Sequence, residues 1–372
     1  MDEIKRGAER GTRVNKAVYG FAIVGSGAIG SFHAEQLKQV GGAKLIAVCD
    51  ENPQRAGQFA ERYSCSAYTS LNDMLQRDDI DIVNICTPSS LHGGQAIACA
   101  KAGKHVIVEK PMDITLATAD SMIAACQEAG TKLSVVSQHR LDRSVAQVKQ
   151  LIREGAFGKL VLAAGAVHWY RSQQYYDSSS WRGTWQWDGG GALMNQGIHI
   201  VDLLQYLMGP VESVQAQCRT LGHRNIEVED TAAALLRFGS GAVGTLTATT
   251  SAYPGLNTRI ELFGTKGSAI IENDSLVFCQ YEEAAGDGTI TDAVGSVQHR
   301  TSGANGASNP MSISGETHRL QFSDMIEAIE HDREPLVNGI EGRKPLEIIL
   351  AVYESNRSGK PVLLQPTAGE SA

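Results

Sequence analysis

A glycine-rich turn between an apolar strand and a helix constrains this chain more than any other feature of its sequence. The apolar run Phe21–Val24 leads into Gly25–Gly30, which reads GSGAIG, and a helical pattern follows. In that setting a G-x-G-x-x-G pattern is typical of a turn that binds the pyrophosphate of a dinucleotide. Its glycines permit the tight turn, the approach of backbone N–H groups to the phosphates, and close packing of helix on strand. We therefore predict cofactor contacts at Gly25, Gly27, Ala28, Ile29 and Gly30.

An acidic residue lies where the second apolar strand ends. Asp50 follows the apolar run Leu45–Val48, and it comes about 20 residues after the last glycine of the turn. A carboxylate at that place accepts hydrogen bonds from the ribose hydroxyls and repels a 2′-phosphate. The position predicts NAD rather than NADP as the cofactor. The alternative is a glycine-rich turn that binds no ligand.

Apolar strands and helical stretches alternate through the first part of the chain. Strand patterns at 82–86, 105–108 and 133–136 alternate with helical patterns such as 95–102 and 116–129. Continuous apolar strands that alternate with amphipathic helices are typical of a parallel sheet covered on both faces. We predict an α/β fold class with a doubly wound Rossmann domain over residues 17–138. A polar tail is predicted over residues 1–16.

The pattern changes after residue 138 to longer strands, most of which have no helix between them. Turn signals such as Gly239–Gly241 separate several of these strands, as in an antiparallel meander. One predicted helix, Leu193–Met208, interrupts the series, and residues 282–315 are predicted to form a long loop. We predict a second domain of the α+β type over residues 139–365, with a large, mostly antiparallel open sheet.

Charge and composition narrow the classes of partner. The 372 residues carry a net charge of −8, which argues against a nucleic-acid partner or an anionic membrane. The N-terminal residues lack the apolar core of a signal peptide, and no apolar stretch is long enough to span a membrane, so a cytoplasmic protein is predicted. The seven cysteines are scattered, which favours buried free thiols. The histidines do not cluster as ligands do, so no metal is predicted.

Two segments beyond the glycine turn carry a more specific pattern. Thr87–His92 reads TPSSLH, and Gly103–Pro111, after the next helix, reads GKHVIVEKP. Behind a Rossmann turn, this pair resembles the glucose–fructose oxidoreductase/inositol dehydrogenase/MocA (Gfo/Idh/MocA) family. The resemblance covers nearly the whole chain, including Gln138–Arg140, the triple glycine Gly189–Gly191 that runs into His199, and the closing pattern over 347–362.

The resemblance implies roles for the residues at these positions. Lys110 is implied to lie beside the nicotinamide and to act in proton transfer, with a cis peptide bond between Lys110 and Pro111. The placement agrees with two general rules, because ligands bind at the carboxyl ends of strands in such sheets and the pKa of an amine falls in a dry cleft. Outside this pattern, Lys110 would be interpreted as a surface lysine. Further cofactor contacts are predicted at Thr87, Pro88, His92, Glu109, Lys110 and Gln138.

The segment after the triple glycine is predicted to supply the second half of the site. Asn195 and His199 are four residues apart on a predicted helix, so they share a face. In the family, the histidine at the position of His199 contacts the substrate hydroxyl, and the position of Asn195 is often Asp. An amide can hydrogen-bond but cannot tune the histidine as a carboxylate would. We predict that Lys110, His199 and Asn195 are catalytic and that Arg140, Asn195 and His199 contact substrate; the alternative for His199 is a buried structural histidine.

Aromatic residues gather just before the triple glycine. All four tryptophans lie between Trp169 and Trp187, with Arg171 and Arg182 among them. Aromatic faces match the C–H faces of pyranose rings, and arginine donates to hydroxyls, carboxylates or phosphates. We predict substrate contacts at Trp181, Arg182 and Trp185. The alternative is that this segment packs across a subunit interface, where such residues are also enriched.

These features predict an NAD-dependent dehydrogenase that moves a hydride to or from a secondary alcohol of a sugar, glycoside, nucleotide sugar or cyclitol. Lys110 or His199 would take the hydroxyl proton while the other orients the hydroxyl, with help from Asn195. One alternative is a redox-neutral glycoside hydrolase or lyase that retains NAD. Another is a non-catalytic NAD-binding regulator, against which the presence of both Lys110 and His199 speaks. An open antiparallel sheet leaves a face that needs cover, and the family resemblance implies that this face mediates subunit contacts, so a homodimer or homotetramer is predicted.

Overall fold

The computed structural model describes residues 16–284, 290–294 and 315–364. The predicted polar tail lies outside the described residues except for Lys16, and so does most of the loop predicted over 282–315. Within the described ranges, no helix is both long and apolar enough to cross a membrane.

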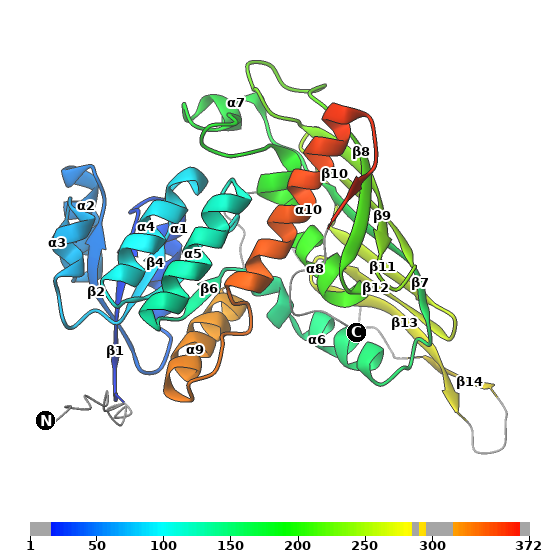
Figure 1. The fold of residues 1–372 in the computed structure, drawn as a ribbon, viewed down its shortest axis with the longest axis horizontal. Helices are drawn as coiled ribbons and strands as arrows, with labels where there is room; N and C mark the ends of the chain where they lie inside the picture. Colours follow the sequence, from blue (N-terminus) through cyan, green and yellow to red (C-terminus); the bar gives the residue numbers. More distant parts are fainter. Residues whose placement is uncertain (1–15, 285–289, 295–314, 365–372) are drawn as a thin grey trace, which may run out of the picture.

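The first part of the chain forms a six-stranded parallel sheet in the order β3-β2-β1-β4-β5-β6 (Figure 1). The strands are β1 (Tyr19–Val24), β2 (Ala43–Cys49), β3 (Ser66–Tyr68), β4 (Ile82–Ile85), β5 (His105–Val108) and β6 (Leu133–Val135). The helices are α1 (Ala28–Leu37), α2 (Pro53–Tyr63), α3 (Leu71–Leu75), α4 (His92–Lys101) and α5 (Leu116–Ala129). Every residue of β1 and β4 is buried, as a sheet covered on both faces requires. The predicted Rossmann fold is confirmed, and its strand order reverses between β1 and β4, where ligands bind in such sheets.

The second part forms a nine-stranded sheet in the order β14-β13-β12-β11-β7-β10-β9-β8-β15. The strands are β7 (Leu160–His168), β8 (Val211–Arg219), β9 (Thr231–Phe238), β10 (Val243–Thr249), β11 (Arg259–Gly264), β12 (Gly267–Glu272), β13 (Ser275–Ala284), β14 (Ile290–Val294) and β15 (Val362–Leu363). Only β7 and β10 pair in parallel, so the predicted, mostly antiparallel sheet is confirmed. The sheet also reaches into the predicted loop, since β14 pairs with the end of β13. Backbone pairing supplies those hydrogen bonds whatever the side chains, so the composition of the segment did not reveal a strand.

Helices cover one face of this sheet. They include α6 (Arg143–Arg153) and α8 (Ile198–Met208), which continues directly from a π-helical segment, η3 (Ala192–Gly197). The short α7 (Gln173–Asp177) lies in the segment that follows β7. Side chains along β9 alternate between buried and exposed, with Leu236 buried and Leu235 59% exposed. Packing against α8 accounts for the buried face, since a Cβ on Gly165 of β7 would lie 2.6 Å from Ile200. On the opposite face, side chains such as Leu235 and Val243 are exposed, and no helix of the described residues packs there.

The last described segment connects the two sheets. Helix α9 (Glu316–Glu330) contributes Phe322 to the same apolar cluster as Phe21 of β1, although the sequence placed α9 in the second domain. Backbone of Val337 accepts a hydrogen bond from Val135 of β6, 2.9 Å long. Helix α10 (Gly339–Ser358) then runs along the junction of the two halves towards β8 (Figure 1). The boundary at residue 138 therefore separates the sheets, but the C-terminal segment packs on both.

Candidate active site

The glycine turn leaves an open space in front of α1. A Cβ on Gly30 would lie 2.0 Å from the carbonyl oxygen of Gly25, so only glycine permits this approach of helix to strand. A Cβ on Gly27 would meet nothing within 4 Å, and no side chain caps the helix there. Backbone N–H groups of Ala28 and Ile29 begin the helix, whose N-terminus favours an anion. The residues present therefore fit the pyrophosphate of a dinucleotide.

Asp50 faces this turn from the end of β2. Its carboxylate accepts hydrogen bonds from the backbone N–H of Ser26 (3.0 Å) and the Ser26 hydroxyl (2.6 Å), and it pairs with Arg55 (2.9 Å). Burial acts to raise the pKa of Asp50, but the hydrogen bonds from Ser26, Asn52 and Arg55 lower it overall. The group is therefore an anion beside the turn, which suits ribose hydroxyls and repels a 2′-phosphate.

The loops that follow β4 and β5 are joined to each other. The ring of His92 lies 2.9 Å from the carbonyl oxygen of Thr87 and 2.8 Å from that of Pro111. The Thr87 hydroxyl donates to Gln95 (2.6 Å), and Pro88 precedes a short 3₁₀ turn. His92 thus fixes the relative position of two strand ends that meet at the predicted cofactor site.

A buried carboxylate ties the lysine loop to the first helix. Glu109 lies 3.0 Å from the ring of His33 on α1, and it also accepts a hydrogen bond from the backbone N–H of Lys110 (3.1 Å). Burial opposes ionisation, but the hydrogen bond with His33 and nearby positive charge lower the pKa of Glu109 to about 2. Sequence reasoning missed His33, whose only signal is its place on the helix that opens at the glycine turn.

Gln138 offers a buried polar atom after β6. The side chain is 7% exposed, and within the described part of the chain its Oε1 has no hydrogen-bond partner. A buried amide oxygen without a donor costs about 1–3 kcal/mol. The carboxamide of a nicotinamide is a donor of suitable chemistry, so this residue also fits the predicted cofactor.

Lys110 connects the two halves of the site. The peptide bond between Lys110 and Pro111 is cis, as the family resemblance implied. The ammonium nitrogen donates to the backbone carbonyl of Asn195 in η3, 2.9 Å away. Burial lowers the pKa of Lys110, and Arg171 lowers it further, against the opposing charges of Glu109 and Asp188. The neutral amine is therefore more accessible here than in water, as a proton acceptor requires.

His199 lies against a second histidine that sequence reasoning did not single out. The rings of His199 and His139 meet edge to face, with centroids 5.0 Å apart. His139 also contacts Asp142 (2.8 Å) and Asp274 (2.9 Å), and these carboxylates raise its pKa to about 10 although burial opposes this. Burial, Lys110 and His139 hold the pKa of His199 well below its usual value. The pair therefore consists of a neutral His199 beside a cationic His139.

Arg140, predicted to contact substrate, instead forms ion pairs within the protein. Its guanidinium donates to Asp202 (2.9 and 2.6 Å) and to Glu341 (2.7 Å), and the residue is only 3% exposed. Asp202 lies on α8 one turn after His199, while Glu341 lies on α10. The donors of Arg140 are directed at two carboxylates of the protein, so the residue anchors α8 to α10.

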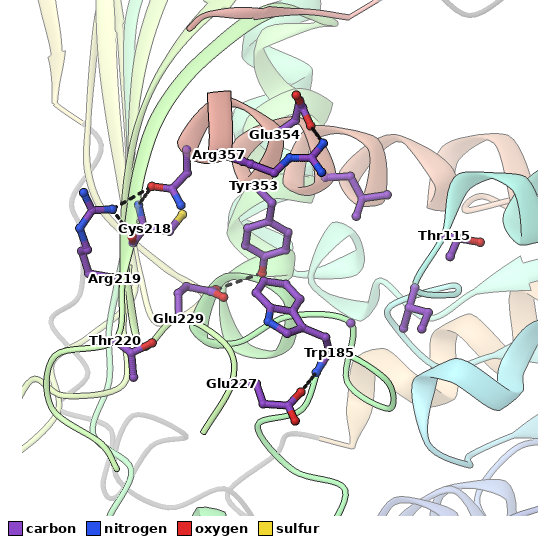
Figure 2. Close-up of a pocket in the computed structure, with 14 residues that line it drawn as sticks. Thr115, Trp185, Cys218, Arg219, Thr220, Glu227, Glu229, Tyr353, Glu354 and Arg357 are labelled. Carbon is purple, nitrogen blue, oxygen red and sulfur yellow. Dashed lines mark hydrogen bonds and ion pairs between the residues drawn. The ribbon is translucent and has the colours of Figure 1, made fainter. Parts of the chain in front are cut away.

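The aromatic segment divides between two places. The guanidinium of Arg182 lies over the rings of Tyr175 (4.4 Å) and Trp181 (5.1 Å), and together with Asp188 and Asn195 it lines a narrow recess. Trp185 instead packs edge to face on Tyr353 of α10, and both side chains line a second cavity (Figure 2).

Two further ionisable groups lie near Lys110: Arg171, which the sequence placed in the aromatic segment without assigning it to the site, and Asp188, which sequence reasoning did not single out. Arg171 is 4% exposed and stacks between Trp169 (5.0 Å) and Tyr175 (5.6 Å). Burial raises the pKa of Asp188 to about 6, although a hydrogen bond from Gly183 opposes the shift. Both residues lie in segments already notable for tryptophan and glycine, but nothing in the sequence ranks them above their neighbours.

Among the described residues, two clusters of three side chains have possible metal-ligand atoms within 4.8 Å of one another. The first cluster is His33, Glu109 and His318, and the second is His139, Asp142 and Asp274. In each group a histidine contacts a carboxylate directly, which satisfies both side chains. The expectation of no metal stays a prediction.

A Rossmann domain whose carboxylate excludes a 2′-phosphate and whose strand ends hold a desolvated lysine is the arrangement of an NAD-dependent oxidoreductase. Comparison with known proteins gives the same class. Residues 19–137 match an oxidoreductase family with an NAD-binding Rossmann fold, and residues 145–270 match the GFO/IDH/MocA C-terminal domain. The chain belongs to the Gfo/Idh/MocA family and is an NAD-dependent oxidoreductase.

Several relatives are similar over much of their length. Myo-inositol 2-dehydrogenase of Thermotoga maritima is 33% identical over 68% of this chain and 74% of its own. The NAD-dependent scyllo-inositol 2-dehydrogenase of Bacillus subtilis is 29% identical over 92% and 95%. The crystal structure of the WlbA dehydrogenase from Bordetella pertussis, in complex with NADH and UDP-GlcNAcA, has a TM-score of 0.84 and 35% identity, covering 95% of this chain and 100% of that one.

Proposed function

We propose that this protein oxidises a secondary alcohol of a sugar derivative, or reduces the corresponding ketone, with Lys110 as the proton carrier. The observation that carries the proposal is the position of the amine. It sits at the carboxyl end of β5, is desolvated, and is held 2.9 Å from the carbonyl of Asn195 on the segment that leads to His199. A lysine in such a place can exchange a proton near neutral pH.

The division of labour follows from the charges. Bound NAD⁺ supplies the acceptor for the hydride that leaves the alcohol carbon. The neutral amine of Lys110 accepts the hydroxyl proton and becomes an ammonium, which the carbonyl of Asn195 and the carboxylate of Glu109 stabilise. His199, kept neutral by burial and by the cations around it, hydrogen-bonds the same hydroxyl and orients it. In this proposal Asn195 acts on Lys110 through its backbone.

The substrate is proposed to carry an anionic group. Arg171 and Arg182 lie on the ring of Tyr175 at 5.6 and 4.4 Å, and the Arg182 Nε is buried without a hydrogen-bond partner among the described residues. Burial and the positive charge of Arg182 lower the pKa of Arg171, which means that the two guanidinium cations repel each other in a partly dry place. An anion bound between them would offset this repulsion. The similar WlbA dehydrogenase was crystallised with UDP-GlcNAcA, a nucleotide sugar acid. A uronate or a diphosphate is the matching chemistry.

The test is net NADH formation with a panel of substrates. UDP-GlcNAcA, UDP-GlcNAc, myo-inositol and a neutral hexose are compared at equal concentrations of purified enzyme and NAD⁺. We expect accumulation of NADH and the highest kcat/KM with the acid nucleotide sugar. Conversion of substrate without NADH accumulation would favour a redox-neutral reaction instead, and equal kcat/KM for neutral sugars would exclude the proposed anion contact.

We also propose that a second copy of the chain covers the open face of the large sheet. Exposed apolar side chains occupy three adjacent strands there: Leu162 of β7 and Val243 of β10, which are paired, and Leu235 of β9. Apolar area of this kind in neighbouring strands favours association. Light scattering after size exclusion should give at least a dimer, and Leu235→Asp should shift it towards the monomer.

A further inference from the structure

A buried carboxylate lies behind the first turn of the helix that carries the site. Glu229, just before β9, is 4% exposed. Its side chain accepts hydrogen bonds from the backbone N–H groups of Gly191 (2.9 Å) and Leu193 (2.8 Å), and its backbone carbonyl accepts that of Ala192 (2.9 Å). One residue thus receives three successive N–H groups at the start of η3, where a negative charge is favourable.

Helix α10 holds this carboxylate from the other side. The hydroxyl of Tyr353 donates to Glu229 at 3.0 Å, and its ring packs on Trp185. Figure 2 shows Glu229, Tyr353 and Trp185 on the wall of one cavity. This cavity has a volume of about 740 Å³ and lies between α10, β8 and the segment of Thr115. The Glu229 side chain is therefore in contact with the active-site helix on one side and close to a solvent-filled cavity on the other.

The triple glycine makes this contact possible. A Cβ on Gly191 would lie 1.8 Å from the carbonyl oxygen of Glu229, and a Cβ on Gly190 would lie 2.2 Å from the Tyr353 hydroxyl. No side chain fits at either position without displacing these partners. The glycines that the sequence placed in the site thus serve the approach of Glu229 and Tyr353 to the backbone.

We propose that Glu229 is a positioning residue of the dehydrogenase site, which fixes the turn that presents Asn195 and His199 to Lys110. The inference rests on the proposed function. The path is short: the backbone N–H of Asn195 donates to the carbonyl of Gly191 (2.9 Å), and the carbonyl of Asn195 receives the Lys110 ammonium (2.9 Å). A displacement of Gly191 would therefore move the backbone of Asn195, one helical turn later, and with it the carbonyl that binds the amine of Lys110.

Protonation of Glu229 weakens this arrangement, since a carboxylic acid accepts fewer hydrogen bonds than a carboxylate. Burial raises the pKa of Glu229 to about 7, against the hydrogen bonds from Leu193, Gly191 and Tyr353. The other ionisable groups that interact with it are the thiol of Cys218 on β8 and the hydroxyl of Tyr176 on α7. The turn is therefore held most firmly above about pH 7.

The first experiment replaces the carboxylate and keeps its size. Glu229→Gln places an NH₂ group against backbone N–H donors, so we expect kcat to fall about tenfold to a hundredfold with little change in the Kd for NADH. Hydrogen exchange of the free protein should accelerate about tenfold or more in a peptide that contains Gly191–Leu193. Glu354→Gln is the matched control, because Glu354 lines the same cavity and, within the part of the chain that the structure describes, its ion pair is with Arg357 alone. It should leave kcat, Kd and exchange unchanged.

A second variant and a pH profile keep the test independent of folding. Tyr353→Phe removes one hydrogen bond to Glu229 and keeps the ring, so a smaller loss of kcat is expected, with a melting temperature only a few degrees lower. The wild-type kcat should fall as pH drops through about 7, and Glu229→Gln should lose the part of this fall that Glu229 causes while keeping the acid limb produced by protonation of Lys110. Wild-type exchange and kcat in Glu229→Gln, or an unaltered acid limb, would overturn the inference. Loss of the proposed function would differ, since wild-type enzyme would then form no NADH while the exchange result still held.

Discussion

The two halves of the active site are constructed in different ways. On the Rossmann side, backbone geometry places the groups: the turn Gly25–Gly30 precedes α1, and Lys110 follows a strand end. On the other side, ionisable side chains far apart in sequence hold the helix, as where Arg140 joins Asp202 to Glu341. Where the backbone places a functional group, a short stretch of sequence such as the glycine turn is enough to predict its position. Buried charge pairs form only in the finished fold, and the second half has several of them where the Rossmann side has the contact of Glu109 with His33, so we expect the second half to be more sensitive to pH and to single substitutions.

The largest effect is expected at the point where the halves meet. Lys110→Met keeps the bulk of the stem and removes the proton carrier, so kcat should fall by about 10²–10⁴. The fold should be unaffected, because the strand end and not the ammonium places this residue. Steady-state kinetics and thermal melting measure both. Lys101→Met, on the exposed last turn of α4, is the control and should behave as wild type. A Lys110→Met enzyme with most of its kcat would refute the role of the amine.

Removal of Arg140 should affect stability rather than the chemical step. Arg140→Met leaves the buried carboxylate of Asp202 without its partner, which costs about 3–5 kcal/mol in the free energy of unfolding. Urea unfolding measures the change. Arg357→Met, on the same helix as Glu341, is the matched control, because Arg357 and its partner Glu354 are 79% and 43% exposed and such pairs contribute about 0–1 kcal/mol. Equal effects of the two variants would mean that charge pairs do not organise the second half.

The ion pairs of His139 should make a contribution to the free energy of unfolding that depends on pH. Its pKa is about 10 in the folded protein and 6.5 ordinarily, so the folded state binds this proton more tightly. The stabilisation is fully present below pH 6.5 and is lost as pH rises through about 10. The difference in melting temperature between wild type and His139→Gln should therefore be largest in acid and shrink towards pH 10. His331→Gln, at an exposed position, should give no such trend. A constant difference would contradict the raised pKa.

The smallest effect is expected for the side chain of Asn195. Lys110 contacts the backbone carbonyl of this residue, and Asn195→Ala keeps that carbonyl. The loss in kcat/KM should be about 1 kcal/mol, the scale of one neutral hydrogen bond, and the acid–base profile should not move. A loss as large as that of Lys110→Met would show that the amide itself takes part in the reaction.

The sequence predicted the Rossmann side in detail because its signals are local. Turn glycines, an acidic strand end and the residues around Lys110 each lie in a short window. It could not predict that Arg140 would be held by Glu341, or that His139 would contact Asp274, because such pairs depend on how distant segments pack. Nor could it predict that the ring of Trp185 would pack on Tyr353 of α10, since aromatic composition does not say which way a side chain points; the substrate contact of Trp185 stays a prediction.

The position of α9 has a consequence for the order in which the protein forms during synthesis. Phe322 and Met325 complete the apolar cluster around Phe21 and Ile23, and the Gln321 side chain donates to the Val135 carbonyl at the end of β6. A nascent Rossmann domain therefore leaves the ribosome with an uncovered apolar face, because the helix that covers it is made only after strands β7 to β14 of the second sheet. Exposed apolar surface of this kind binds chaperones and aggregates. A fragment that ends at residue 138 should be insoluble alone and should be rescued by co-expression of residues 139–372.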